Sequence, residues 1–166
     1  MERKQYTFSV LPATLEELKA LPESSLQDPF ASAALCILAL AQYPKDREVC
    51  YQMMEFLKGP AGLTPYDRQF IRDRLFDKDY VPRSYFAGAT PENNYTPAQP
   101  FTLAVEDNPY SRTNEGYITL YLTSGGADSP RSMSLRLKPS TGQWFVHEYG
   151  GLLMGIRIPK EEDPWA

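Results

Sequence analysis

The sequence has little of what metal, nucleotide or nucleic-acid sites require. Its 166 residues include one histidine and two cysteines, and the cysteines form no CxxC pair, so no metal site is predicted. The net charge is −4 and no cluster of Lys and Arg occurs, which argues against binding to nucleic acid or to an anionic membrane surface. The patterns GxSxG, HExxH, GxxxxGK[ST] and GxGxxG are all absent, so no catalytic motif and no cofactor are predicted.

Long apolar runs are also missing. The longest lies between Phe30 and Ala41, well short of the roughly 20 residues that a membrane-spanning helix needs. No secretory signal follows Met1. For a chain that is complete at its N-terminus, these features predict a soluble cytoplasmic protein.

The two cysteines, Cys36 and Cys50, fall within expected helices and have apolar neighbours. Such thiols are typically buried and reduced, and they pack as small hydrophobic side chains. A disulfide between neighbouring helices is the alternative that spacing alone leaves open.

Length and composition favour one folded domain over residues 1–166, with 42% hydrophobic and 13% aromatic residues. We divide it into a helical part (12–79), a proline-rich crossing (80–100), a sheet part (101–158) and a C-terminal tail (159–166). The predicted class is α+β. About four helices and a short first strand precede a C-terminal antiparallel sheet of three to five strands, and the helices pack on this sheet.

Helix starts are clearly marked. Thr14, Asp28 and Thr64 each stand where a side-chain oxygen can accept a hydrogen bond from a free amide of the first turn. The helix after Asp28 is apolar on nearly every side, which predicts a central helix surrounded by protein. A further helix is expected to run through Lys58 and to end at Gly59.

Strands are predicted where apolar and polar residues alternate. The segments are 5–11, 84–87, 101–106, 116–123, 132–138 and 143–149. Residues 139–142 indicate a tight hairpin, and 124–130 a longer hairpin loop. The glycines of that longer loop lie between strands, whereas a phosphate-binding loop normally leads into a helix.

His147 and Glu148 are weak catalytic candidates because they are the only histidine with an adjacent carboxylate. Neighbouring residues of a strand point to opposite faces, so the two could act together only at a bulge. The oxygen-rich segment around Asp107 and Asn108 is better explained by turn chemistry than by a calcium site.

The last third of the chain carries specific sequence blocks. They include Asn108-Pro109-Tyr110-Ser111, Gly126-Ala127-Asp128-Ser129-Pro130-Arg131 and Asp163-Pro164-Trp165-Ala166. Over about 105–166 the chain resembles an uncharacterised bacterial domain family of unknown function, found mainly in gut-type anaerobes. The resemblance implies no reaction, cofactor or binding residue. It draws attention to Asp128 and Arg131, which could pair with each other or recognise a ligand.

Two functions fit these observations. The first is a non-enzymatic binding or regulatory module with a protein partner. Its contact face would consist of exposed aromatic residues. These are Tyr117, Tyr121, Tyr149 and Trp165. Trp165 could instead belong to a solvated tail or dock onto the body of the domain.

The second is a small-molecule or catalytic pocket between the helices and a curved sheet, as in nuclear-transport-factor-like folds by analogy. Charged side chains of such a pocket would come from His147, Glu148 or Arg136. The sequence favours the binding module, and an enzyme is the less favoured interpretation.

Overall fold

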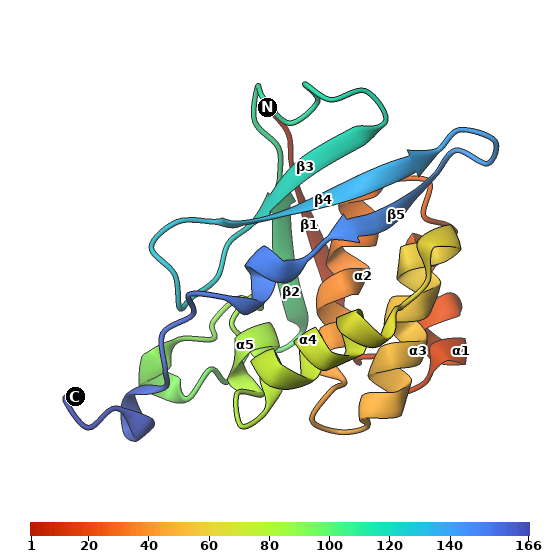
Figure 1. The fold of residues 1–166 in the computed structure, drawn as a ribbon. Coiled ribbons are helices and arrows are strands. Elements are labelled where there is room, and N and C mark those ends of the chain that lie inside the picture. The colour runs from red at the N-terminus through yellow and green to blue at the C-terminus, as the bar shows by residue number, and fades with distance from the viewer.

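A computed structural model describes residues 1–166 and shows an α+β fold with the helices gathered on one side of a curled sheet (Figure 1). The helices are α1 (Leu15–Lys19), α2 (Pro29–Ala41), α3 (Arg47–Lys58), α4 (Pro65–Leu75) and α5 (Tyr80–Arg83). The strands are β1 (Arg3–Phe8), β2 (Phe101–Glu106), β3 (Tyr117–Leu122), β4 (Arg131–Lys138) and β5 (Gln143–Glu148). The predicted class and the order of helices before sheet are confirmed.

All neighbouring strands are antiparallel, in the order β1-β2-β3-β4-β5. The expected first strand exists, and it pairs along its whole length with β2, from Arg3 opposite Glu106 to Phe8 opposite Phe101. It ends earlier than predicted. Val10 is 73% exposed, because the chain turns away from the sheet after the buried Phe8.

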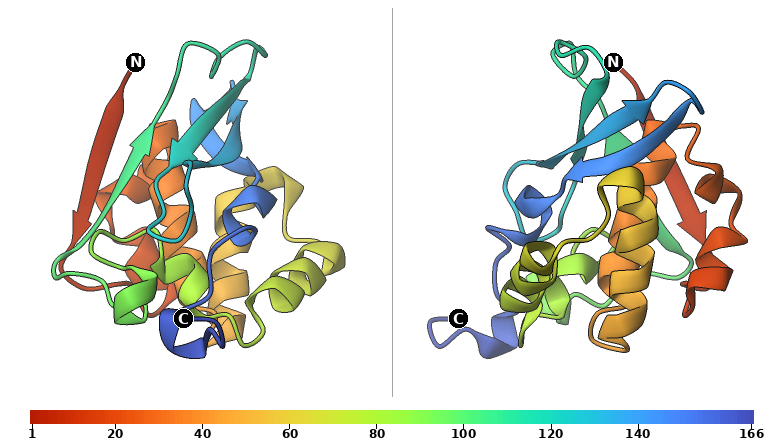
Figure 2. Two further views of the ribbon diagram at one scale, coloured as in Figure 1. Left: turned by 90° about the vertical axis from the view of Figure 1, so that its left-hand side faces the viewer. Right: turned by 45° about the vertical axis from the view of Figure 1, so that its right-hand side comes forward.

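Helix α2 is the centre of the fold, as its all-round apolar sequence predicts. Every residue from Phe30 to Leu40 is buried. The sheet curls around this helix (Figure 2). β2 and β3 share only two residue pairs, Val105 with Leu122 and Glu106 with Tyr121, so the sheet can bend between them.

The three predicted caps are confirmed. Thr14 accepts from the amide of Glu17, and Asp28 accepts from the amide of Phe30. Thr64 forms a full capping box at the start of α4. These bonds satisfy amides that have no partner inside the helix, so each fixes where its helix begins.

The predicted strand at 84–87 is wrong. The crossing begins instead with the helical turn α5 and continues through turns. Tyr85 and Phe86 are adjacent and both buried, at 3% and 2% exposure, whereas alternation in a half-buried strand would turn one of them outward.

Cys36 and Cys50 are buried free thiols, and the alternative disulfide is not formed. Burial raises the pKa of the Cys36 thiol to about 12 and that of Cys50 even further. Both side chains belong to the hydrophobic core.

The glycine-containing loop after β3 is a packed hairpin loop, as predicted. The Ser124 hydroxyl donates to the Ser84 hydroxyl at 2.7 Å, and the Gly125 amide donates to the Ser84 carbonyl at 2.8 Å. A Cβ atom on Gly125 would lie 2.0 Å from the carbonyl oxygen of Ala89. The loop therefore needs glycine because it packs directly on the crossing.

We expect Gly125→Ala to lower the free energy of unfolding by about 1–3 kcal/mol, because the added methyl group forces backbone to move. Urea denaturation followed by circular dichroism measures this. Ala127→Gly in the same loop is a control for general loop sensitivity and removes a methyl group without a clash. Equal stability of Gly125→Ala and the wild type would contradict the packed loop.

Candidate functional site

A bulge in β5 alters the predicted geometry of His147 and Glu148. Leu135 is opposite Val146 and Ser134 is opposite Glu148, so His147 is an extra residue without a partner on β4. The side chains therefore do not alternate between the two faces of the sheet at this point, and the His147 Nε2 atom lies 3.9 Å from Glu148 Oε1. The two side chains are 41% and 79% exposed, so both are in contact with solvent.

Tyr117 forms a platform for two other predicted residues. Its ring centroid lies 5.0 Å from that of His147, and the Arg136 guanidinium carbon lies 5.7 Å from the Tyr117 ring. These three side chains come from β3, β4 and β5. The register of the sheet therefore brings together residues that are up to 30 positions apart in the sequence.

Tyr149 is not exposed, contrary to the prediction of an aromatic contact face. It is only 4% exposed, because β5 ends at Glu148 and the chain enters a 3-10 turn at Gly150–Leu153. Its hydroxyl donates to Asp67 Oδ1 at 2.9 Å. The end of β5 is thereby joined to the start of α4.

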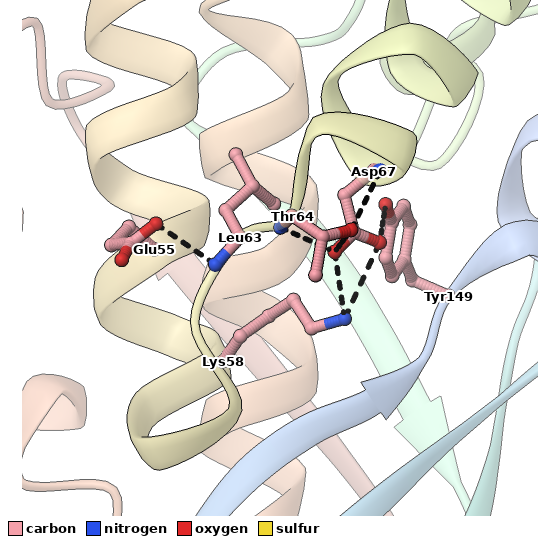
Figure 3. Close-up of polar contacts among 6 residues, drawn as sticks. All are labelled: Glu55, Lys58, Leu63, Thr64, Asp67 and Tyr149. Carbon is pink, nitrogen blue, oxygen red and sulfur yellow. Dashed lines mark hydrogen bonds and ion pairs between the residues drawn. The ribbon is translucent and has the colours of Figure 1, made fainter.

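Asp67 is the centre of a polar network between α3, α4 and the end of β5 (Figure 3). Lys58 Nζ lies 3.3 Å from Asp67 Oδ2. The amide and the hydroxyl of Thr64 both donate to that same oxygen at 2.9 Å. Figure 3 also shows the Leu63 amide donating to Glu55, which holds the connection between α3 and α4.

The network favours the ionised form of Asp67. Burial alone would raise the pKa of this carboxyl, but hydrogen bonds from Thr64 and Tyr149 and the charge of Lys58 together lower it below its usual value. Burial and the hydrogen bond to Asp67 raise the pKa of the Tyr149 hydroxyl. Tyr149 is therefore a hydrogen-bond donor here and not an activated nucleophile.

Two adjoining cavities lie beside this network. The larger one, the α4–β5 groove, has a volume of about 560 Å³ and is bounded by α4, β4 and the end of β5. Besides Asp67, Glu148 and Tyr149, its lining includes Tyr66, Phe70, Thr119, Ser132, Ser134 and Met154. The smaller one, the basic pocket, has a volume of about 330 Å³ and lies between the end of α3 and the β4–β5 hairpin. Lys58 and His147 line both.

One polar atom in the groove has no partner. The Ser134 hydroxyl oxygen is buried and forms no hydrogen bond within the protein. A buried hydroxyl without a partner costs about 1–3 kcal/mol, so such atoms are uncommon.

Asp128 and Arg131 do not pair with each other. Asp128 accepts from Arg157 at 2.8 Å, and Arg131 donates to the carbonyl of Gly155 at 2.8 Å. The reason is that residues 155–157 run beside the hairpin loop, where the Arg157 amide donates to the Gly126 carbonyl. Asp128 thus attaches residues 155–157 to the hairpin loop, and Arg131 attaches them to β4.

The other two aromatic candidates lie apart from the groove. Tyr121 is half-buried on β3, and Trp165 is 92% exposed. The C-terminal end of the chain lies away from the sheet (Figure 1). Trp165 does not dock onto the body of the domain. Asp107 accepts from the Glu2 amide and from Arg112, which lower the pKa of its carboxyl, so it connects the N-terminal residues to the loop after β2. The predicted turn chemistry is found at Asn108, whose side-chain oxygen accepts from the Tyr110 amide.

The fold and the site define an α+β domain with a groove at one edge of the sheet. The predicted catalytic residues do not form a reactive centre in it. The family model "Domain of unknown function (DUF6935)" matches residues 10–160, and the chain belongs to this family. No curated protein matches the chain, and no solved structure does. None of the helices has the length and apolar character needed to span a membrane.

We expect Asp67→Asn to lower the free energy of unfolding at pH 7 by about 1.5–3 kcal/mol, because it weakens charge-assisted bonds to Lys58 and Thr64. A carboxyl with a lowered folded-state pKa stabilises the protein above its unfolded pKa of about 3.9 and loses that effect as the pH falls through the folded value. The difference from wild type should therefore shrink below about pH 4.

Denaturant titrations between pH 3 and 7 measure both effects. Asp73→Asn is the matched control, since Asp73 lies on the same helix and bonds only to Gln69. An equal loss of stability in the two variants would contradict a special role for the Asp67 network.

Proposed function

We propose that residues 1–166 form one domain that acts as a non-enzymatic binding module and holds a small organic ligand in the α4–β5 groove. The observation that carries the proposal is the meeting of the groove and the basic pocket at Lys58 and His147. Their volumes, about 560 and 330 Å³, fall in the range of ligand sites, roughly 300–1,000 Å³. The lining combines aromatic rings with a few polar groups, which is typical of such sites.

The proposal takes the non-enzymatic binding role from the first function considered from the sequence and the small-molecule ligand from the second, but it changes the place of the site. The expected aromatic contact face is not assembled, because Tyr149 is buried and Trp165 lies in the tail. The space between helices and sheet is filled by one cluster of 37 buried residues, which speaks against a deep interior pocket. The groove lies instead beside β5, where His147, Glu148 and Arg136 gather.

A binding role rather than catalysis is supported by how the reactive groups are used. Asp67 and Tyr149 bond to each other, and the carboxylate beside His147 belongs to Glu148, which is largely exposed. The proposal includes a bacterial source among gut-type anaerobes, which the resemblance over 105–166 supports. It also includes a cytoplasmic location, which suits the free thiols of Cys36 and Cys50. A protein partner that recognises the module is also proposed, with Trp165 as its exposed contact residue.

Titration of ¹⁵N-labelled protein with neutral aromatic probes, benzyl alcohol and benzamide, tests the groove. We expect amide shifts at groove residues, and we expect Ser132→Trp to abolish them because the exposed Ser132 lines the groove. Ser140→Trp, in the exposed β4–β5 turn, should leave them unchanged.

A preserved wild-type amide spectrum outside the groove shows that each variant is folded. Shifts that are confined to other surfaces, or that survive in Ser132→Trp, would contradict the proposal. So would the absence of any shift at millimolar probe concentrations.

A further inference from the structure

We propose that the basic pocket receives an anionic group of the ligand, a carboxylate or a phosphate, attached to an apolar body. This inference rests on the proposed function and names the chemistry of its ligand. The residues that would bind the anion are Arg136 and Lys138, with Lys58 and His147 at the boundary to the groove.

The first argument is the sign of the charge. Every titratable side chain that lines the basic pocket is basic, namely Lys58, Arg136, Lys138 and His147. The acidic residues Asp67 and Glu148 line only the larger groove. A pocket lined only by basic side chains is not expected from the composition, because the chain as a whole carries a net charge of −4.

The second argument is that two of these charges are free. Lys58 is largely neutralised by Asp67 at 3.3 Å. Arg136 and Lys138 form no ion pair with any carboxylate of the protein. Both project from the same face of β4 because they are two residues apart on a strand. Two unpaired cations on one wall attract an anion.

The third argument is orientation. The Arg136 guanidinium carbon lies 5.7 Å from the centroid of the Tyr117 ring, and the ring of His147 lies 5.0 Å from the same platform. A cation–π contact holds the guanidinium beside the ring without using its N–H groups, which remain available to the oxygens of a carboxylate or phosphate. Tyr117 thus reduces the conformational freedom that Arg136 would lose on binding.

The fourth argument is the apolar floor. Leu137, Phe145 and Val146 line the pocket beside the charges, together with Pro60 and Pro139. Gly59 has a φ of +59°, and a Cβ atom there would lie 2.3 Å from a Phe145 ring carbon. The Phe145 ring therefore lies directly on the backbone of Gly59 and is firmly held. A ring or alkyl chain of the ligand would pack on this floor.

Benzoate, phenyl phosphate and neutral benzyl alcohol are the probes, titrated into ¹⁵N-labelled protein. We expect at least one of the two anions to shift amides around the basic pocket. The double variant Arg136→Gln/Lys138→Gln should weaken its binding about tenfold or more, because two charge-assisted contacts are lost. The stronger binder distinguishes carboxylate from phosphate.

Lys45→Gln/Arg47→Gln is the matched control. It removes one Lys and one Arg from exposed positions of the same spacing at the start of α3, so it changes the net charge equally. Anion binding should persist in this control, and benzyl alcohol should bind all three proteins alike.

The results separate the two proposals. Anion binding that is unchanged in Arg136→Gln/Lys138→Gln, or weakened equally in the control, would overturn the anion site. Binding of benzyl alcohol in the groove without binding of either anion would overturn the anion site and leave the binding module standing. Failure of all three probes to bind would count against both.

Discussion

The fold depends on the burial of one helix on all of its sides. Helix α2 has no polar face, and a single layer of sheet covers only one side of a helix. The other sides of α2 must be covered by curvature of the sheet and by the other helices. The short pairing between β2 and β3 permits that curvature, and α3 completes the enclosure. The hydrophobic effect that buries α2 therefore sets the shape of the whole sheet.

That enclosure also determines where the groove forms. β5 is the last strand of the sheet, and its Trp144 backbone bonds to the Leu26 carbonyl and to the hydroxyl of Ser32 on α2. Because β5 is held on α2, the end of α3 meets β5 at Gly59 and Phe145. The Asp67 network then joins α4 to the end of β5. The groove and the basic pocket lie on the two sides of this junction, so the network that stabilises the fold also shapes the proposed site.

Local signals account for what the sequence could predict. The caps at Thr14, Asp28 and Thr64 act within a few residues, and the alternation of β3 and β4 depends only on a half-buried sheet. Tertiary contacts account for the errors. The bulge at His147 depends on the register between β4 and β5, and the burial of Tyr149 depends on a bond to a residue 82 positions earlier.

The candidate site was only partly predictable for the same reason. His147, Glu148 and Arg136 stood out by residue type. His147 lines both cavities, Glu148 lines the groove and Arg136 lines the basic pocket. Lys58 and Lys138 did not stand out in the sequence, because single lysines are common on the surface of any protein. Thr64 and Asp67 carry a local signal, a capping box, but nothing local connects them to Tyr149.

The central claim is that the groove and the basic pocket form one ligand site with an anion-binding end. A crystal structure of the protein grown with phenyl phosphate tests it most directly. We expect the phosphate oxygens within hydrogen-bond distance of Arg136 and Lys138, with the ring lying on Phe145. A phosphate bound elsewhere on the surface, or a basic pocket filled by the protein's own side chains, would contradict the claim.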